Sequence, residues 1–166
     1  TLGRYELLRP VLGQLRKQTV PARQVVVVDQ NDPERRDRAI YEEFADIGVE
    51  VVFQDERGQW VSRNEAVRRA TGEWIAFIDD DSEIAEDFLE QHLEGLRRYA
   101  ADLSTGASLA LIGAPVPENY SFFRVADQWD SGNGMCHRSL LEKFGLFDQQ
   151  YDRQRRGDAE FGLRVQ

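Results

Sequence analysis

Residues 73–81 read Glu-Trp-Ile-Ala-Phe-Ile-Asp-Asp-Asp, an apolar run that passes directly into three aspartates. A second run of this kind, residues 24–29, reads Gln-Val-Val-Val-Val-Asp. Neither run alternates apolar and polar residues, which is typical of strands buried on both faces of a parallel sheet. Ligands bind beyond the carboxyl ends of such strands, so we expect Asp29 and the triplet at residues 79–81 to share one crevice.

Helical patterns alternate with these runs along the chain. Asp32 followed by Pro33 predicts the start of a helix that continues through residues 40–47. The alternating order predicts right-handed crossovers and a three-layer α/β/α sandwich with a mostly parallel central sheet. Apolar spacing predicts further helices near residues 7–15, 66–70, 88–96 and 140–144 and from about residue 158, further strands at residues 50–53 and 109–113, and loops over residues 114–134.

The composition indicates one soluble globular domain. The chain has 166 residues, of which 41% are apolar and 31% are charged. Thirty acidic residues against 21 basic ones give a net charge of −9, which argues against nucleic acid and anionic lipid as partners. One cysteine and two histidines exclude a disulfide framework and the usual zinc sites. No apolar run approaches the roughly 20 residues that span a bilayer.

The aspartate triplet has the spacing of a cation site. Asp79 and Asp81 are two residues apart, and in an extended segment this spacing turns both carboxylates to the same side. Together they can hold a divalent cation, which would offset the repulsion among three neighbouring carboxylates. The alternative is a structural role, in which Asp81 or Ser82 caps the helix that follows.

Four motifs, in a fixed order, resemble those of the family 2 glycosyltransferases. The opening motif lies within residues 1–29, and the central signature lies within residues 58–81. The closing motifs are Phe-Gly-Leu-Phe-Asp at residues 144–148 and Gly-Asp-Ala-Glu-Phe-Gly-Leu-Arg at residues 157–164. The resemblance therefore covers nearly the whole chain.

The resemblance implies a GT-A fold, in which a Rossmann-like half binds a nucleoside diphosphate sugar and an acceptor half lies beyond it. By the same resemblance, Asp29 meets the uridine or thymidine base and the ribose, and Thr1 and Arg4 line that pocket. The other residues implied to bind the nucleotide are Arg63, Asp79 and Asp80.

The resemblance also implies a metal-dependent, inverting transfer of a sugar to an acceptor hydroxyl, in the synthesis of surface polysaccharide or another glycan. It assigns Mg²⁺ or Mn²⁺ to Asp81 and Asp79, with Asp81 as the direct ligand. Such a cation would stabilise the charge that grows on the leaving diphosphate. Asp158 is implied to be the catalytic base that takes the proton of the acceptor hydroxyl.

The chain departs from the family pattern in three places. The first strand of the family, which should precede Thr1, is absent, so we expect one domain over residues 1–166 that lacks this strand and a C-terminal extension. Gly157 stands where a glutamate often precedes the catalytic aspartate. Gln-Asn-Asp at residues 30–32 replaces the commoner Asp-Gly-Ser.

Two other classes of function remain open. A non-catalytic or truncated domain that binds nucleotide sugars would carry the same motifs, and binding without turnover would identify it. A Mg²⁺-dependent phosphotransfer domain also gathers aspartates at strand ends, but it needs a lysine after a later strand, and neither Lys17 nor Lys143 follows an apolar strand. The resemblance places the protein in the cytoplasm and leaves open a peripheral contact with the membrane through regions outside residues 1–166, as well as the oligomeric state.

Overall fold

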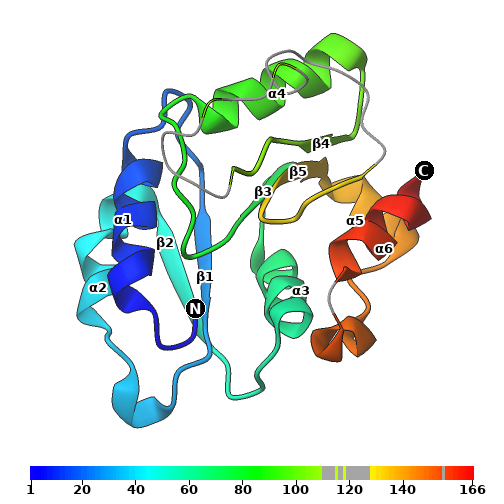
Figure 1. The fold of residues 1–166 in the computed structure, drawn as a ribbon. Coiled ribbons are helices and arrows are strands. Elements are labelled where there is room, and N and C mark those ends of the chain that lie inside the picture. Colours follow the sequence, from blue (N-terminus) through cyan, green and yellow to red (C-terminus); the bar gives the residue numbers. More distant parts are fainter. Residues whose placement is uncertain (110–114, 116–117, 119–127, 155) are drawn as a thin grey trace.

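The computed structural model describes residues 1–109, 115, 118, 128–154 and 156–166. Helices and strands alternate through the first 78 residues, as the sequence predicts (Figure 1). The α-helices are α1 (Tyr5–Arg16), α2 (Ala39–Glu43), α3 (Gln59–Arg69), α4 (Phe88–Tyr99), α5 (Arg138–Phe144) and α6 (Gly157–Val165). The strands are β1 (Val25–Asp29), β2 (Val49–Phe53), β3 (Trp74–Ile78), β4 (Leu103–Thr105) and β5 (Asn133–His137), and the short 3₁₀ helices include η1 (Pro33–Arg35), η2 (Ala45–Ile47) and η4 (Gln149–Arg153).

The strands form two sheets in the part of the chain that the structure describes. β1 and β2 pair in parallel, with Val25 opposite Val49 and Asp29 opposite Phe53. The second sheet has the order β3-β5-β4, and both of its pairings are antiparallel. The prediction of a mostly parallel sheet is therefore confirmed only for β1 and β2. The strand β5, which runs back along β3, was missed because it begins in the stretch predicted as loop.

Helices cover both faces of the second sheet, α1 and α2 pack against β1 in the first sheet, and α3 also contacts β1. Alternate residues of β3 and β5 contact opposite layers, as the period of a strand requires. Met135 packs with Phe88, Leu89 and Leu96 of α4 on one face. On the other face lies a cluster of buried aromatic and aliphatic side chains from α3, α5 and α6 and from the stretches before β5 and η4, which includes Trp60, Phe77, Trp129, Leu141, Phe147 and Phe161.

The predicted helix over residues 32–47 is wrong in its continuity, because the structure divides this stretch into η1, α2 and η2. Asp32 makes no side-chain cap, and its carboxylate instead accepts a hydrogen bond from Arg57 at 2.6 Å. Arg36 is extended, and its guanidinium donates to the carbonyl of Asn31 at 3.0 Å and to Asp55 at 2.6 Å. These contacts hold the chain across the end of β1 and interrupt the helix.

The strand predicted at residues 109–113 lies mostly outside the described residues. Leu109 itself is described, is exposed and belongs to no strand.

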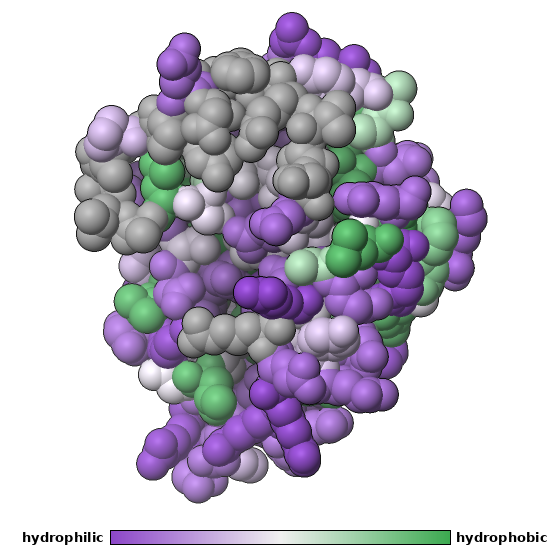
Figure 2. All heavy atoms as spheres, turned by 45° about the vertical axis from the view of Figure 1, so that its right-hand side comes forward, coloured by the Kyte–Doolittle hydropathy of each residue, from purple (hydrophilic) through white to green (hydrophobic). Residues whose placement is uncertain are grey.

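The described surface carries few large exposed apolar side chains, and they come from different elements. On the face drawn in Figure 2, hydrophilic residues predominate among the coloured atoms. Within the described residues, no helix has the length and apolar character needed to cross a membrane. The exposed large apolar residues are Leu2, Leu7, Tyr99, Leu109 and Leu163.

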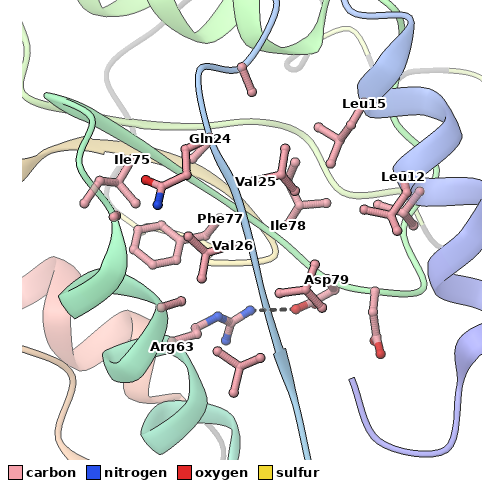
Figure 3. Close-up of a pocket in the computed structure, with 18 of the residues that line it drawn as sticks. Leu12, Leu15, Gln24, Val25, Val26, Arg63, Ile75, Phe77, Ile78 and Asp79 are labelled. Carbon is pink, nitrogen blue, oxygen red and sulfur yellow. Dashed lines mark hydrogen bonds and ion pairs between the residues drawn. The ribbon is translucent and has the colours of Figure 1, made fainter. Parts of the chain in front are cut away.

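A cavity of about 820 Å³ separates the two sheets and lies between β1 and β3. Figure 3 shows Val25 and Val26 of β1 and Ile75 and Phe77 of β3 among its lining residues. At one end of the cavity, Thr1 continues the hydrogen-bond pattern of a parallel ladder on the free edge of β1. Its backbone nitrogen donates to the carbonyl of Val28 at 2.6 Å, and its carbonyl accepts from the Gln30 N–H at 2.9 Å.

Candidate functional site

The acidic triplet after β3 lies beside the carboxyl end of β1, as the sequence predicts. The backbone nitrogen of Thr1, which is bonded to β1, lies 4.0 Å from Asp80 Oδ2. Arg4 reaches the same group, and its guanidinium pairs with Asp80 at 2.6 Å and with Asp81 at 2.8 Å. The structure therefore brings Thr1, Arg4, Asp80 and Asp81 together at the end of β1.

Arg63 connects this group to the rest of the site. It lies on α3, its side chain is 11% exposed, and its Nη2 donates to Asp79 Oδ1 at 2.6 Å and to the carbonyl of Ser131 at 3.2 Å. Figure 3 shows this ion pair at the polar end of the cavity between β1 and β3. Burial lowers the pKa of Arg63, and the carboxylates of Asp79, Asp158 and Asp130 oppose that effect. Three carboxylates from three segments of the chain therefore act on Arg63 electrostatically, and the one in direct contact is that of Asp79.

The carboxylate of Asp79 lies in a crowded acidic environment. Burial raises its pKa, Arg63 opposes this, and Asp81, Asp130 and Asp80 raise it further. Asp79 and Asp130 converge on Gly132, where a Cβ atom would lie 2.7 Å from Asp79 Oδ2 and 3.2 Å from Asp130 Oδ1. A glycine at this position lets the two carboxylates approach each other.

Asp29 is placed differently from the other acids, because its side chain is fully buried and its oxygens have four donors. Oδ1 accepts from the backbone N–H of Asn31 at 2.9 Å and from the Asn31 side-chain amide at 2.7 Å. Oδ2 accepts from the hydroxyls of Tyr5 at 2.5 Å and Tyr41 at 2.8 Å. Its assignment to the base and ribose stays a prediction, and these contacts show that Asp29 also organises the loop after β1.

Asp158 lies in the first turn of α6, and its Oδ1 accepts from the backbone N–H of Ala159 at 2.9 Å. The residue before it explains a departure from the family pattern. A Cβ atom on Gly157 would lie 2.5 Å from the indole of Trp60, so the glutamate that often stands there would collide with this ring. Trp60, which is on α3, therefore requires glycine at position 157.

Several residues of the site were missed by sequence reasoning. Tyr5, Tyr41 and Asn31 surround Asp29, yet their positions in the sequence share no motif or spacing. Asp130 lies in a stretch predicted as loop, and its carboxylate accepts from Ser108 at 2.7 Å and from the N–H of Gly132 at 2.8 Å. The contacts from Tyr5 and Tyr41 to Asp29 and from Ser108 to Asp130 join segments that are distant along the chain, so no sequence signal identifies them.

The triplet fits a divalent cation chemically. Its donors are carboxylate oxygens, which hard cations prefer, and the buried Asp80 Oδ2 has no hydrogen-bond partner. Within the described residues, no group of three or more His, Cys, Asp or Glu side chains is placed so that it could hold a metal ion. Mg²⁺ sites commonly use one or two carboxylates and complete their coordination with water and substrate phosphates. Asp79 and Asp81 therefore suit a cation that arrives with a phosphorylated ligand.

The sequence model described as glycosyl transferase family 2 matches residues 1–143. Over 103 residues the chain is 35% identical to TuaG of Bacillus subtilis (strain 168), which is assigned as a teichuronic acid biosynthesis glycosyltransferase. That alignment covers 60% of this chain and 41% of TuaG. The chain thus spans less than half the length of this relative.

Two solved structures share the fold over 99% of the chain. One is S. aureus TarS, residues 1–349, in complex with UDP, with a TM-score of 0.79, 20% identity and 52% of TarS covered. The other is the mannosyltransferase PcManGT of Pyrobaculum calidifontis in complex with GDP-Man and Mn²⁺, with a TM-score of 0.77, 22% identity and 49% covered. These likenesses confirm the predicted GT-A fold of the α/β class.

Proposed function

The chain belongs to glycosyl transferase family 2, and on that premise we propose that it moves a sugar from a UDP- or dTDP-linked donor to an acceptor hydroxyl, with inversion at the anomeric carbon. The observation that carries the proposal is the position of Arg63. It pairs with Asp79 at the end of β3, and the carboxylate of Asp158 on α6 also raises its pKa. The carboxylate assigned to the donor site therefore contacts this guanidinium, and the carboxylate assigned to the acceptor proton acts on the same guanidinium electrostatically.

The proposed reaction breaks the bond between the anomeric carbon and a diphosphate oxygen while the acceptor oxygen bonds to the opposite face of that carbon. Asp158 takes the proton from the acceptor hydroxyl, which keeps the attacking oxygen nucleophilic. The diphosphate leaves with the bonding electrons. Arg4 and Arg63 are suited to its oxygens, because guanidinium groups bind phosphates through paired hydrogen bonds.

Asp81 and Asp79 are the residues that we propose to hold Mg²⁺ or Mn²⁺. When bound, the cation supplies positive charge to the leaving diphosphate. The Arg4 guanidinium forms ion pairs with Asp80 and Asp81 in this structure. Its positive charge therefore lies where we propose that the diphosphate binds. The PcManGT complex with Mn²⁺ supports a metal in this fold.

The UDP complex of TarS supports a uridine donor, and the assigned role of TuaG supports surface polysaccharide as the product. GDP-Man in PcManGT shows that this fold also accepts another base, so the base has to be tested. We propose that the protein acts in the cytoplasm. The family resemblance implies this location, because it implies a nucleotide-sugar donor, which we expect to find there.

We expect UDP or dTDP to raise the melting temperature of the protein more than ADP or GDP does, because a ligand that binds only the folded state stabilises it. The measurement is a thermal-shift series at equal nucleotide concentration, with and without Mn²⁺. Mn²⁺ should increase the shift given by UDP. Equal shifts from all four nucleotides would contradict the pyrimidine assignment.

The same series includes Asp81→Ala, which should lose the increase that Mn²⁺ gives while still responding to UDP alone. Asp87→Ala is the matched control, because Asp87 lies in the same acidic stretch. Among the described residues, its carboxylate accepts a hydrogen bond only from the side-chain amide of Gln91. This control should keep the response to Mn²⁺. An unchanged response in Asp81→Ala would mean that the triplet is not the metal site.

The alternative of a domain that binds nucleotide sugars without turnover is distinguished by product formation. A donor that binds and is never consumed, with any acceptor, would favour that class. The family match argues against the alternative of a Mg²⁺-dependent phosphotransfer domain, because membership of this family accounts for the aspartates at the strand ends.

We also propose that a strand preceding Thr1 completes the domain. The gap between β1 and β3 is apolar, and the Thr1 backbone already pairs with Val28 and Gln30 on the free edge of β1. A strand running back from Thr1 would give β1 and β3 a common neighbour and satisfy backbone groups at both edges. The proposed occupant is thus an extended apolar segment of this same protein.

A protein that carries its natural residues before Thr1 should melt at least about 5 °C higher than the chain that begins at Thr1. The added backbone hydrogen bonds and apolar burial are the expected cause. Differential scanning calorimetry of the two forms measures the change. Equal melting temperatures would contradict the proposed strand.

A further inference from the structure

Helix α3 is capped by a carboxylate from a distant part of the chain. Asp152, in η4, accepts hydrogen bonds from the backbone N–H groups of Trp60 at 2.7 Å and Val61 at 3.3 Å. These N–H groups belong to the first turn of α3, where no partner within the helix is available. A carboxylate at this end also interacts favourably with the helix dipole.

The approach of Asp152 depends on the residue that precedes α3. A Cβ atom on Gly58 would lie 2.7 Å from the Asp152 carboxylate, closer than such atoms can stand. Glycine at this position therefore leaves the space that the carboxylate occupies. The local sequence supplies no substitute, because Gly58 has no side chain and makes no cap of its own.

Two further contacts join α3 to the segments that precede and follow η4. The Asn64 side chain bonds the Phe147 backbone twice, donating to its carbonyl at 2.8 Å and accepting from its N–H at 2.9 Å. The Trp60 indole packs against Gly157, next to Asp158. Both segments that flank η4 are therefore fixed against α3.

Arg63 lies one turn further along α3, where its guanidinium stacks over the Trp60 ring at 5.0 Å and pairs with Asp79 of the donor site at 2.6 Å. One helix thus connects the residue that faces the proposed donor phosphates with the segment that carries the proposed base. Contacts at its first turn determine where that segment lies relative to Arg63.

We propose that Asp152 is a positioning residue that fixes the segment carrying Asp158 against helix α3, so that the base keeps its place relative to Arg63 and the donor. This inference rests on the proposed function. It assigns no contact with substrate to Asp152. The expected consequence is a loss of turnover without a matching loss of nucleotide affinity.

The test compares Asp152→Ala, Asp152→Asn and Asp148→Ala in the full-length protein. Asp148 is the matched control, because its side chain caps η4 locally by accepting from the Gln150 N–H at 2.9 Å and makes no described contact with α3. Asp152→Ala should lower kcat about 10–100-fold, since displacement of a catalytic group by about 1 Å has effects of this size. Asp152→Asn should be intermediate, because its amide oxygen can still accept from one N–H.

Three measurements separate positioning from simple destabilisation. The dissociation constant of UDP, from calorimetry, should change less than about threefold in Asp152→Ala. The value of kcat is measured about 15 °C below the melting temperature of each variant, where the folded state still predominates. Amide hydrogen exchange should increase over residues 156–161 in Asp152→Ala and stay unchanged over these residues in Asp148→Ala, which removes a hydrogen bond only from the Gln150 N–H. Normal kcat in Asp152→Ala would overturn this proposal alone. Failure of the unmodified protein to bind UDP would overturn the proposed function, and this inference with it.

Discussion

Replacement of Asp158 by asparagine is expected to lower kcat by about 10²–10⁴-fold, the usual effect of removing a general base. An amide has the same shape as the carboxylate but cannot take the proton of the acceptor hydroxyl. Asp158 follows Gly157, which packs against the Trp60 ring, and Arg63 stacks over the same ring and pairs with Asp79, so the lost charge belongs to the segment next to the proposed donor site. Initial rates with saturating donor and acceptor, in the full-length protein, measure the effect.

The matched control for this prediction is Glu160→Gln, two residues along the same helix. Both oxygens of Glu160 are bonded to Arg164, at 2.9 Å from Nε and 2.9 Å from Nη2, so this carboxylate is already engaged. Glu160→Gln should therefore keep kcat, and UDP affinity should be unchanged in both variants. Normal kcat in Asp158→Asn together with a large loss in Glu160→Gln would transfer the role of base to Glu160.

The strands that carry the site could be predicted because their information is local. Residues 25–28 and 74–78 are apolar without alternation, and each run is followed directly by aspartate, so both the strand and its polar end are visible in one short window. The structure has β1 and β3 at these positions and places the following acids within reach of Arg4. Helices α1, α3 and α4 were predictable for the same reason.

The strand pairing of the second sheet could not be predicted from local sequence. β5 contains Gly134 and polar residues at both ends, and it forms because β3 and β4 offer it two edges. Such pairing depends on neighbours that are far away in the sequence, and it overrides local propensity. The broken helix after Asp32 has a similar cause, since Arg36 binds Asp55 across the loop.

The contacts inside the site are also long-range, and Asp29 is the clearest example. Its position after β1 was predictable, but Tyr5 and Tyr41 come from helices α1 and α2 on either side of it in the sequence. Gly157 is another example. The sequence shows only the missing glutamate, and the Trp60 ring that explains it becomes visible in three dimensions.

Asp29→Ala is expected to lower the free energy of unfolding by about 3–5 kcal/mol at pH 7. It would leave the buried hydroxyl of Tyr41 and the donors of Asn31 without an acceptor, at about 1–3 kcal/mol for each unsatisfied group. Urea denaturation measures the change. Asp32→Ala is the matched control three residues away, because its ion pair with Arg57 is exposed on both sides and should matter little.

The contribution of Asp29 should also depend on pH. Burial alone would raise its pKa, but hydrogen bonds from Tyr5, Asn31 and Tyr41 outweigh burial and the pKa is lowered. The unfolded-state pKa of an aspartate is about 3.9, and the folded-state pKa of Asp29 lies below it. The stabilisation that ionised Asp29 gives the folded state is therefore complete above about pH 3.9. It is lost as the pH falls through the folded-state pKa. Asp29→Asn should remove this part of the acid dependence, and equal acid dependence in the variant and the unmodified protein would contradict the assignment.

Asp29→Asn also separates the two roles of this residue, because the amide keeps the size of the side chain and one acceptor oxygen. If the carboxylate only organises Tyr5, Tyr41 and Asn31, the variant should lose stability, and UDP affinity should stay normal wherever the protein remains folded. If the carboxylate meets the nucleotide, as the family resemblance implies, UDP affinity should fall more than the change in stability explains. Because four donors surround the carboxylate, Asp29→Asn must lower stability in either case. Only a loss of UDP affinity beyond what the lower stability explains therefore measures direct contact with the nucleotide.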